Sequence, residues 1–188
     1  LGTSQISSIP YVLSLKFTNL SFGQTTFIFN MLFILIQLLI LKKDFHPIQF
    51  LQVLANILFS FFIDISMLVL AWLNPQTLPL RILSLLIGCA ILAIGISVEV
   101  AHDVIKVPGE GIVHAISRVS GIEFGKVKIR FDVTLIIMAT LLSFLFFHKL
   151  NGIGLGTIIS AVLVGPMISF VNRYLPGIGK IRSLADHR

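Results

Sequence analysis

Polar residues recur at helical spacing inside one of the most apolar stretches of the chain. Asp64 lies between the segments FSFFI and ISMLVL. Four polar residues precede it at intervals of three or four positions: Gln49, Gln52, Asn56 and Ser60. This spacing places all of them on one face of a helix. Because a charge near the centre of a bilayer costs about 2.5–3.5 kcal/mol, the face predicts either the wall of a polar cavity or hydrogen bonds to a neighbouring helix.

A nine-residue motif occurs twice and ends on a small polar residue each time. The first copy is FGQTTFIFN, which ends at Asn30, and the second is FGKVKIRFD, which ends at Asp132. Each copy opens an apolar segment, and we place its last residue about one turn into a helix. That position suits a capping or interfacial role, since acids favour helix N-termini. Alternatively, Asn30 and Asp132 form a pseudo-symmetric pair that lines a central site.

Two other segments contain an isolated proline followed by a short amphipathic run. They are SQISSIPYVLSLKF, with Pro10, and EVAHDVIKVPGEGIVHAISR, with Pro108. Both resemble broken elements, which at membrane depth are tolerated only where protein buries them or water lines them. A half-helix that begins at Pro108 would offer free backbone N–H groups to a substrate. The alternative is a surface loop with an interfacial helix.

These patterns together predict one set of substrate-binding residues. We expect a small polar solute to contact Ser8, Pro10, Tyr11, Asn30, Asn56, Ser60, Asp64, Pro108, Glu110 and Asp132.

Residue patterns for metal or covalent chemistry are sparse. Glu99, His102 and Asp103 could contribute to a metal site, because Glu-x-x-His supplies ligands from one helix face. A two-metal site needs two such motifs, and the chain has one. The nucleophile motif G-x-S-x-G and the zinc motif H-E-x-x-H do not occur. We therefore expect no metal, no cofactor and no enzymatic activity.

Composition defines the broad class of the protein. Of the 188 residues 56% are hydrophobic and 12% charged, and the mean hydropathy is +1.00. Soluble domains carry roughly twice as many charges. A helix of about 20 apolar residues spans a bilayer, and we predict five spans: about 24–42, 48–73, 78–99, 129–148 and 153–173. The net charge of +6 does not indicate nucleic acid, since no basic stretch interleaves with exposed aromatic residues.

The two motifs and the two prolines define an internal repeat. Pro10 matches Pro108, and with the motifs aligned the second copy has gained four residues. The second copy has a span before its proline, so we expect one before the first copy too. The predicted fold class is an all-α polytopic membrane protein. We expect six spans in the native chain, the first of which is missing here. The spans form two inverted three-helix repeats with broken or re-entrant segments. A five-span protein is the alternative. The repeats are residues 1–76 and 77–175, followed by a basic tail, 176–188.

The distribution of cations agrees with an inverted arrangement. Of the 14 Lys and Arg residues, all but Lys16, Arg81 and Lys149 fall on one side of the predicted membrane. Cytoplasmic loops are enriched in Lys and Arg, so that side and the C-terminus are predicted to be cytoplasmic.

Several segments resemble one family when taken together: GTSQISSIPYVLSLKF, SFGQTTFIFN, FIDISM, VPGEG, FGKVKIRFD and GIGLGTIISAVLVGP. They are similar to the YczE/YyaS/YitT-type bacterial integral membrane proteins over nearly the whole chain. The resemblance implies a six-span, multi-pass protein of the bacterial plasma (inner) membrane. It implies no catalytic residue.

Two functions remain open from the sequence. The first is a transporter for a small polar solute, bound in a central cavity between the repeats, with proton coupling through Asp64, Glu99 or Asp132. The second is a non-transporting membrane module, a substrate-capture subunit or scaffold that acts with partner proteins. A cavity bordered by both halves favours transport, and a polar face paired between helices favours the second. The binding partners that we predict are the lipid bilayer, the small polar solute and a second copy of the chain in a homo-oligomer.

The charge distribution generates a prediction about topology. In a background without Cys89, a cysteine placed in the turn 42–45 should resist impermeant thiol reagents in intact cells, because that turn is cytoplasmic. A cysteine at Gln76 should react. Labelling of the first and protection of the second would reverse the orientation.

Overall fold

The structure, a computed structural model, describes residues 2–45, 47–73, 75–102 and 107–174, and the side chains of 44, 47, 99–102, 169 and 172 are excluded. Within these ranges it is helical, with no β-strand. Four helices are long and apolar enough to cross a membrane: α2 (Phe22–Leu41), α3 (Leu51–Val69), α4 (Leu78–His102) and α6 (Phe124–Phe147). The fifth predicted span is α7 (Leu155–Tyr174), whose apolar part, Leu155–Ile168, is shorter. The prediction of an all-helical membrane protein is confirmed.

Local sequence signals set the ends of these helices. Ser21 caps α2 and exchanges hydrogen bonds with Gln24, so two backbone N–H groups gain side-chain partners. Two short 3₁₀ helices, η1 (Lys42–Asp44) and η2 (Pro47–Phe50), join α2 to α3. His148, with φ of 54°, follows the last residue of α6 in the left-handed conformation common after helices.

The two proline segments form short helices, and the half-helix that we expected to begin at Pro108 is present. They are α1 (Gln5–Lys16) and α5 (Pro108–Ser120). Pro10 lies inside α1, whereas Pro108 is the first residue of α5, a position that tolerates the missing N–H group. The prolines are therefore not equivalent. The number of residues from the start of α1 to Phe22 is almost the same as the number from the start of α5 to Phe124. The prediction that the second copy has gained four residues in this stretch is therefore wrong.

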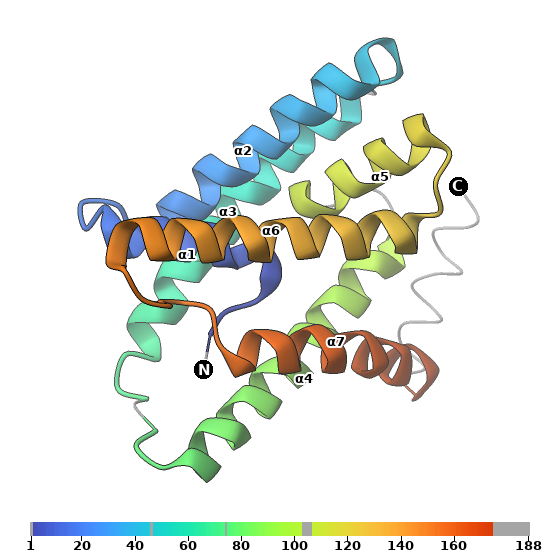
Figure 1. Cartoon of the computed structure of the whole chain (residues 1–188). Coiled ribbons are helices and arrows are strands. Elements are labelled where there is room, and N and C mark those ends of the chain that lie inside the picture. Colours follow the sequence, from blue (N-terminus) through green and yellow to red (C-terminus); the bar gives the residue numbers. More distant parts are fainter. Residues whose placement is uncertain (1, 46, 74, 103–106, 175–188) are drawn as a thin grey trace.

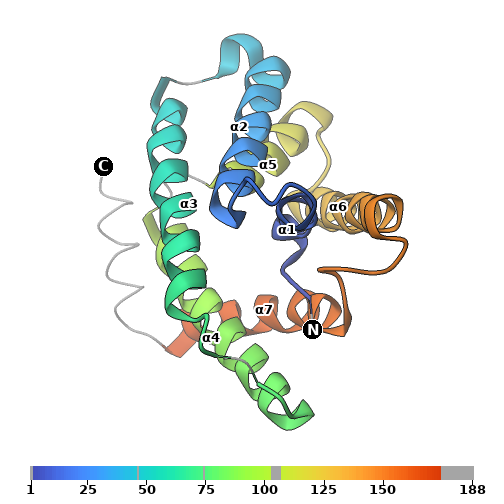
Figure 2. The same cartoon turned by 90° about the vertical axis from the view of Figure 1, so that its left-hand side faces the viewer.

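The short helices exchange partners between the two halves of the chain. α1 packs along α6, and α5 packs along α2 (Figures 1 and 2). Between them lies a core contributed by both halves: Ile9, Phe33, Ile112, Val113, Val127, Leu135 and Ala139. α2 also pairs with α3, and α4 pairs with α7. The outer faces of α3 and α4 expose large apolar side chains, as lipid-facing helices do.

Gly23 permits the close approach of α2 to α3. A Cβ atom at this position would collide with the backbone oxygen of Ser60 and would lie 2.6 Å from Cγ of Asp64. Gly125 is its counterpart in the second motif, and a Cβ atom there would have no atom of the described residues within 4 Å. The same Phe-Gly pair therefore begins two helices, but only one of them needs the glycine for packing.

This difference predicts opposite effects of the same substitution. Gly23→Ala should destabilise the purified protein by about 1–3 kcal/mol, because the helices must separate. Gly125→Ala is the matched control and should leave the melting temperature unchanged or raise it, since alanine favours helix. Thermal unfolding in detergent measures both, and equal melting temperatures for the two variants would contradict the close packing at Gly23.

Candidate functional site

The predicted polar face of α3 is turned toward α2. The side-chain amide of Asn30 donates a hydrogen bond of 2.8 Å to Asn56, which in turn donates to the backbone oxygen of Phe27 at 3.1 Å. Two turns further along α2, Gln37 donates to Oε1 of Gln52 at 3.4 Å. The four side chains are buried. Asn30, Asn56 and Gln52 therefore hold the α2–α3 pair together.

Asp64 stands at the other end of the same helix pair. Its carboxylate accepts a hydrogen bond of 2.5 Å from the Ser21 hydroxyl and one of 2.7 Å from the backbone N–H of Gly23. These are groups at the start of α2, where N–H donors lack helical partners and a negative charge is favourable. Asp64 is half-buried. An acid in the middle of an apolar segment is thus explained by the helix terminus that it caps.

Two polar atoms on or next to this face have no partner. Oγ of Ser60 and Oε1 of Gln49 are buried and make no hydrogen bond in the part of the chain that the structure describes. Ser60 lies between Asn56 and Asp64, beside the close approach at Gly23. The polar face is therefore paired at Gln52, Asn56 and Asp64 and unpaired at Ser60.

The starts of α1 and α5 meet near the middle of the molecule. A Cβ atom on Gly109, the second residue of α5, would lie 2.6 Å from Cδ1 of Ile6, the second residue of α1. From this point α1 extends to the left in Figure 1, and α5 extends to the upper right. Gln37 connects the start of α5 to α2 by donating a hydrogen bond of 3.0 Å to the backbone oxygen of Pro108.

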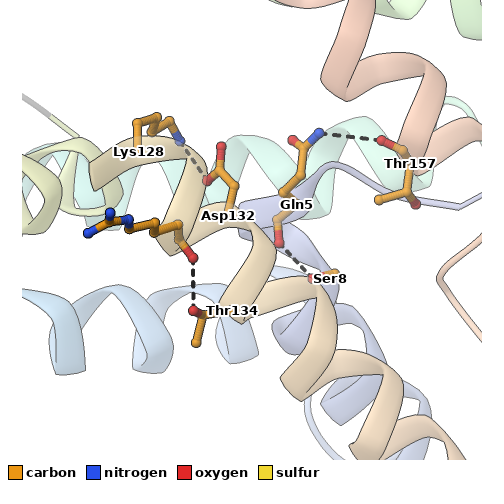
Figure 3. A network of polar contacts seen from close by, with 7 residues as sticks. Gln5, Ser8, Lys128, Asp132, Thr134 and Thr157 are labelled. Atoms are coloured by element: carbon orange, nitrogen blue, oxygen red, sulfur yellow. Dashed lines mark hydrogen bonds and ion pairs between the residues drawn. The ribbon is translucent and has the colours of Figure 1, made fainter. Parts of the chain in front are cut away.

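The start of α7 joins the same region. The Gln5 side chain of α1 donates to the backbone oxygen of Thr157 at 3.3 Å, and the backbone N–H of Thr3 donates to Gly152 at 3.0 Å. Ser8 and Thr157 are completely buried. Figure 3 shows Gln5 turned toward Thr157, with Asp132 of α6 on its other side. Three helix starts and the polar side chains of α1 and α7 therefore converge here.

Asp132 forms an ion pair within its own helix. Its carboxylate lies 2.9 Å from Nζ of Lys128, and both side chains are about three-quarters buried (Figure 3). Asn30 and Asp132 hold the same position in α2 and α6, more than two turns beyond Phe22 and Phe124. Our placement one turn into the helix is wrong because the helices begin earlier, and so neither residue caps. Their partners differ, since Asn30 bonds to α3.

The remaining predicted site residues lie in or beside the short helices. Pro10 and Pro108 are buried, and Glu110 is half-buried in the first turn of α5. Tyr11 packs edge-on against Phe22, with ring centroids 5.3 Å apart. The side chains of Glu99 and His102, and the whole of Asp103, lie outside the described residues.

Sequence reasoning missed several residues of this region, namely Gln5, Gln37, Lys128 and Thr157. One signal could have revealed Gln37. It follows Asn30 by seven residues and Gly23 by fourteen, a spacing that keeps all three on one face of α2. Gln5 and Thr157 carry no comparable pattern, because their contact joins segments that are far apart in the sequence.

The fold and the apolar helices define a polytopic α-helical membrane protein. The chain belongs to a family of unknown function (DUF6198), whose model matches residues 1–173. No curated protein and no solved structure matches the chain.

The capping contact at α2 makes a prediction about Asp64. Asp64→Ala should lower the free energy of unfolding by about 1–3 kcal/mol, because the Gly23 N–H loses a charged acceptor. Asp64→Asn should cost less, since the amide keeps one acceptor oxygen. Ser21→Ala removes the second donor, so the double variant Ser21→Ala/Asp64→Ala should lose less than the sum of the single losses. Additive losses would mean that the two side chains do not act together.

Proposed function

We propose that the chain is a permease for a small polar solute, built from two inverted repeats in the bacterial plasma membrane. The solute binds where α1, α5 and α7 begin. The observation that carries this proposal is the meeting of Ile6 and Gly109 at the starts of two short helices that run in opposite directions. Transporters with inverted repeats place their substrate sites at discontinuous helices of this kind, near the bilayer midplane.

The exchange of partners between the halves supports the inverted repeat. α1 packs on α6 and α5 packs on α2, as a two-fold relation would require. In Figure 1 α2 runs toward the upper right and α6 runs toward the left, so the two long helices cross obliquely with roughly opposite directions. With the cation-rich side cytoplasmic, α1 leads outward from the midplane and α5 leads inward. In this proposal the native protein has six spans, as the resemblance to the YczE/YyaS/YitT-type proteins implies, and the charge distribution makes its C-terminus cytoplasmic.

In this proposal the solute meets groups of both charges. Asp132 and Lys128 offer a carboxylate and an ammonium group, and Gln5 and Ser8 offer amide and hydroxyl groups. Tyr11, Pro10, Pro108 and Glu110 belong to the short helices that frame the site. In this proposal Asn30, Asn56, Ser60 and Asp64 shape the α2–α3 wall, and the protein has no enzymatic activity.

A second function is favoured by the pairing of the α3 polar face with α2. Because Gln52, Asn56 and Asp64 are occupied by contacts to α2, the chain could serve as a non-transporting module. It would capture a substrate or act as a scaffold for partner proteins or for another copy of itself.

Ligand binding separates the central site from a purely structural cluster. Amino acids, short carboxylates and quaternary ammonium compounds serve as probes, and a compound that binds should raise the melting temperature by mass action. Asp132→Asn should abolish that rise while changing the starting melting temperature little, because a partly exposed ion pair contributes at most about 1 kcal/mol. Glu123→Gln is the matched control, since it removes the acid of the exposed Glu123–Lys126 pair at the start of the same helix.

Transport is then measured by counterflow of the labelled compound in proteoliposomes. Uptake above that of empty liposomes, lost in Asp132→Asn and retained in Glu123→Gln, is the expected result. Binding without uptake would favour the non-transporting module. Equal binding by wild type and Asp132→Asn would remove Asp132 from the site.

A further inference from the structure

The corner where α5 turns into α6 carries two cations without acidic partners. Lys128 is paired with Asp132, and Lys126 lies 3.3 Å from Glu123. Arg118, in the last turn of α5, and Arg130, in the second turn of α6, form no ion pair among the described residues. Both side chains are exposed. The corner therefore keeps a positive charge that its own acids do not neutralise.

Arg130 continues an apolar, outward-facing stripe of α6. The stripe consists of exposed residues at intervals of three or four positions: Val133, Ile137, Leu141 and Phe144. Arg130 lies one turn before Val133 on the same face. From Arg130 to the end of α6 at Phe147 the helix rises about 26 Å, which is close to the thickness of the hydrocarbon core. Arg130 is therefore close enough to the end of the span for its long side chain to extend to the lipid headgroups.

Arg118 is held at the same end of the molecule. The His114 ring lies 4.2 Å from the Phe124 ring, and the Ser117 hydroxyl donates a hydrogen bond of 2.6 Å to the backbone oxygen of Ile122. These contacts hold the second half of α5 against the first residue of α6 and the short loop that joins the two helices (Figure 1). Next to Arg118, Val119 is 63% exposed. An exposed apolar residue beside an unpaired cation is typical of a membrane interface.

We propose that Arg118 and Arg130 each bind the phosphate group of an anionic phospholipid at this corner. A guanidinium group presents a planar fork of donors that matches phosphate oxygens. The apolar stripe of α6 lies where an acyl chain of the same lipid would run. Lys126 adds a weaker attraction, because Glu123 partly neutralises it. This lipid contact is independent of the proposed transport site, since neither arginine takes part in that site.

The test compares phosphatidylglycerol with phosphatidylcholine added to the detergent-purified protein. Phosphatidylglycerol should raise the melting temperature of the wild type more than phosphatidylcholine does. In Arg118→Gln/Arg130→Gln the same rise should require about tenfold more phosphatidylglycerol, the loss expected when charged hydrogen bonds to phosphate are removed. Arg118→Lys/Arg130→Lys should restore part of the response.

Arg81→Gln/Lys149→Gln is the matched control, because it removes the same charge from residues on the opposite side of the predicted membrane. This variant should respond to phosphatidylglycerol as the wild type does. Inorganic phosphate separates a free anion site from a lipid site, and it should have no effect at the same concentration. The proposal is overturned if the two lipids act equally, if inorganic phosphate reproduces the effect, or if the Arg118→Gln/Arg130→Gln variant responds like the control.

Discussion

The need of the α2 start for hydrogen-bond acceptors governs the packing of α2 against α3. The first backbone N–H groups of a helix have no partner within it, and the interior of a bilayer offers no water to replace one. At α2 the protein supplies Ser21 and the carboxylate of Asp64. That solution brings α3 so close to α2 that position 23 must be glycine. The α2–α3 pair, and the wall that it forms behind α5, depend on this contact.

Among the described residues the starts of the two short helices have no side-chain cap, and they are held by other contacts. α1 and α5 begin inside the molecule rather than at its surface, and their first turns meet at Ile6 and Gly109. Gln37 reaches across from α2 to the backbone of Pro108, where a Cβ atom on Gly111 would lie 2.5 Å from the Gln37 side-chain oxygen. A small residue at that position lets one buried amide join both halves of the chain. The polar groups of the centre thus combine structural contacts with groups that a solute could use.

Much of this architecture could be predicted from residue patterns. Long apolar runs are sufficient to identify spanning helices, and the spacing of Gln52, Asn56 and Asp64 predicted a common face. The partners of that face could not be predicted, because the contact of Asp64 with Gly23 joins residues 41 positions apart and a periodic pattern carries no information about the facing helix. The prolines misled the alignment for a different reason. Proline is compatible with the start of α5 and also lies inside α1, so its presence does not fix a helix position.

The two copies of the Phe-Gly motif show how one sequence pattern acquires two roles. Both copies start a long helix at phenylalanine, and the ninth residue of each is small and polar. In the first copy α3 covers the motif, so Gly23 is tightly packed and Asn30 is buried against Asn56. In the second copy no described residue covers Gly125 in this way, and α7 packs along α4. A buried position favours a neutral amide, whereas a partly exposed one accepts an acid paired with Lys128. The difference between Asn30 and Asp132 therefore follows from what covers each helix.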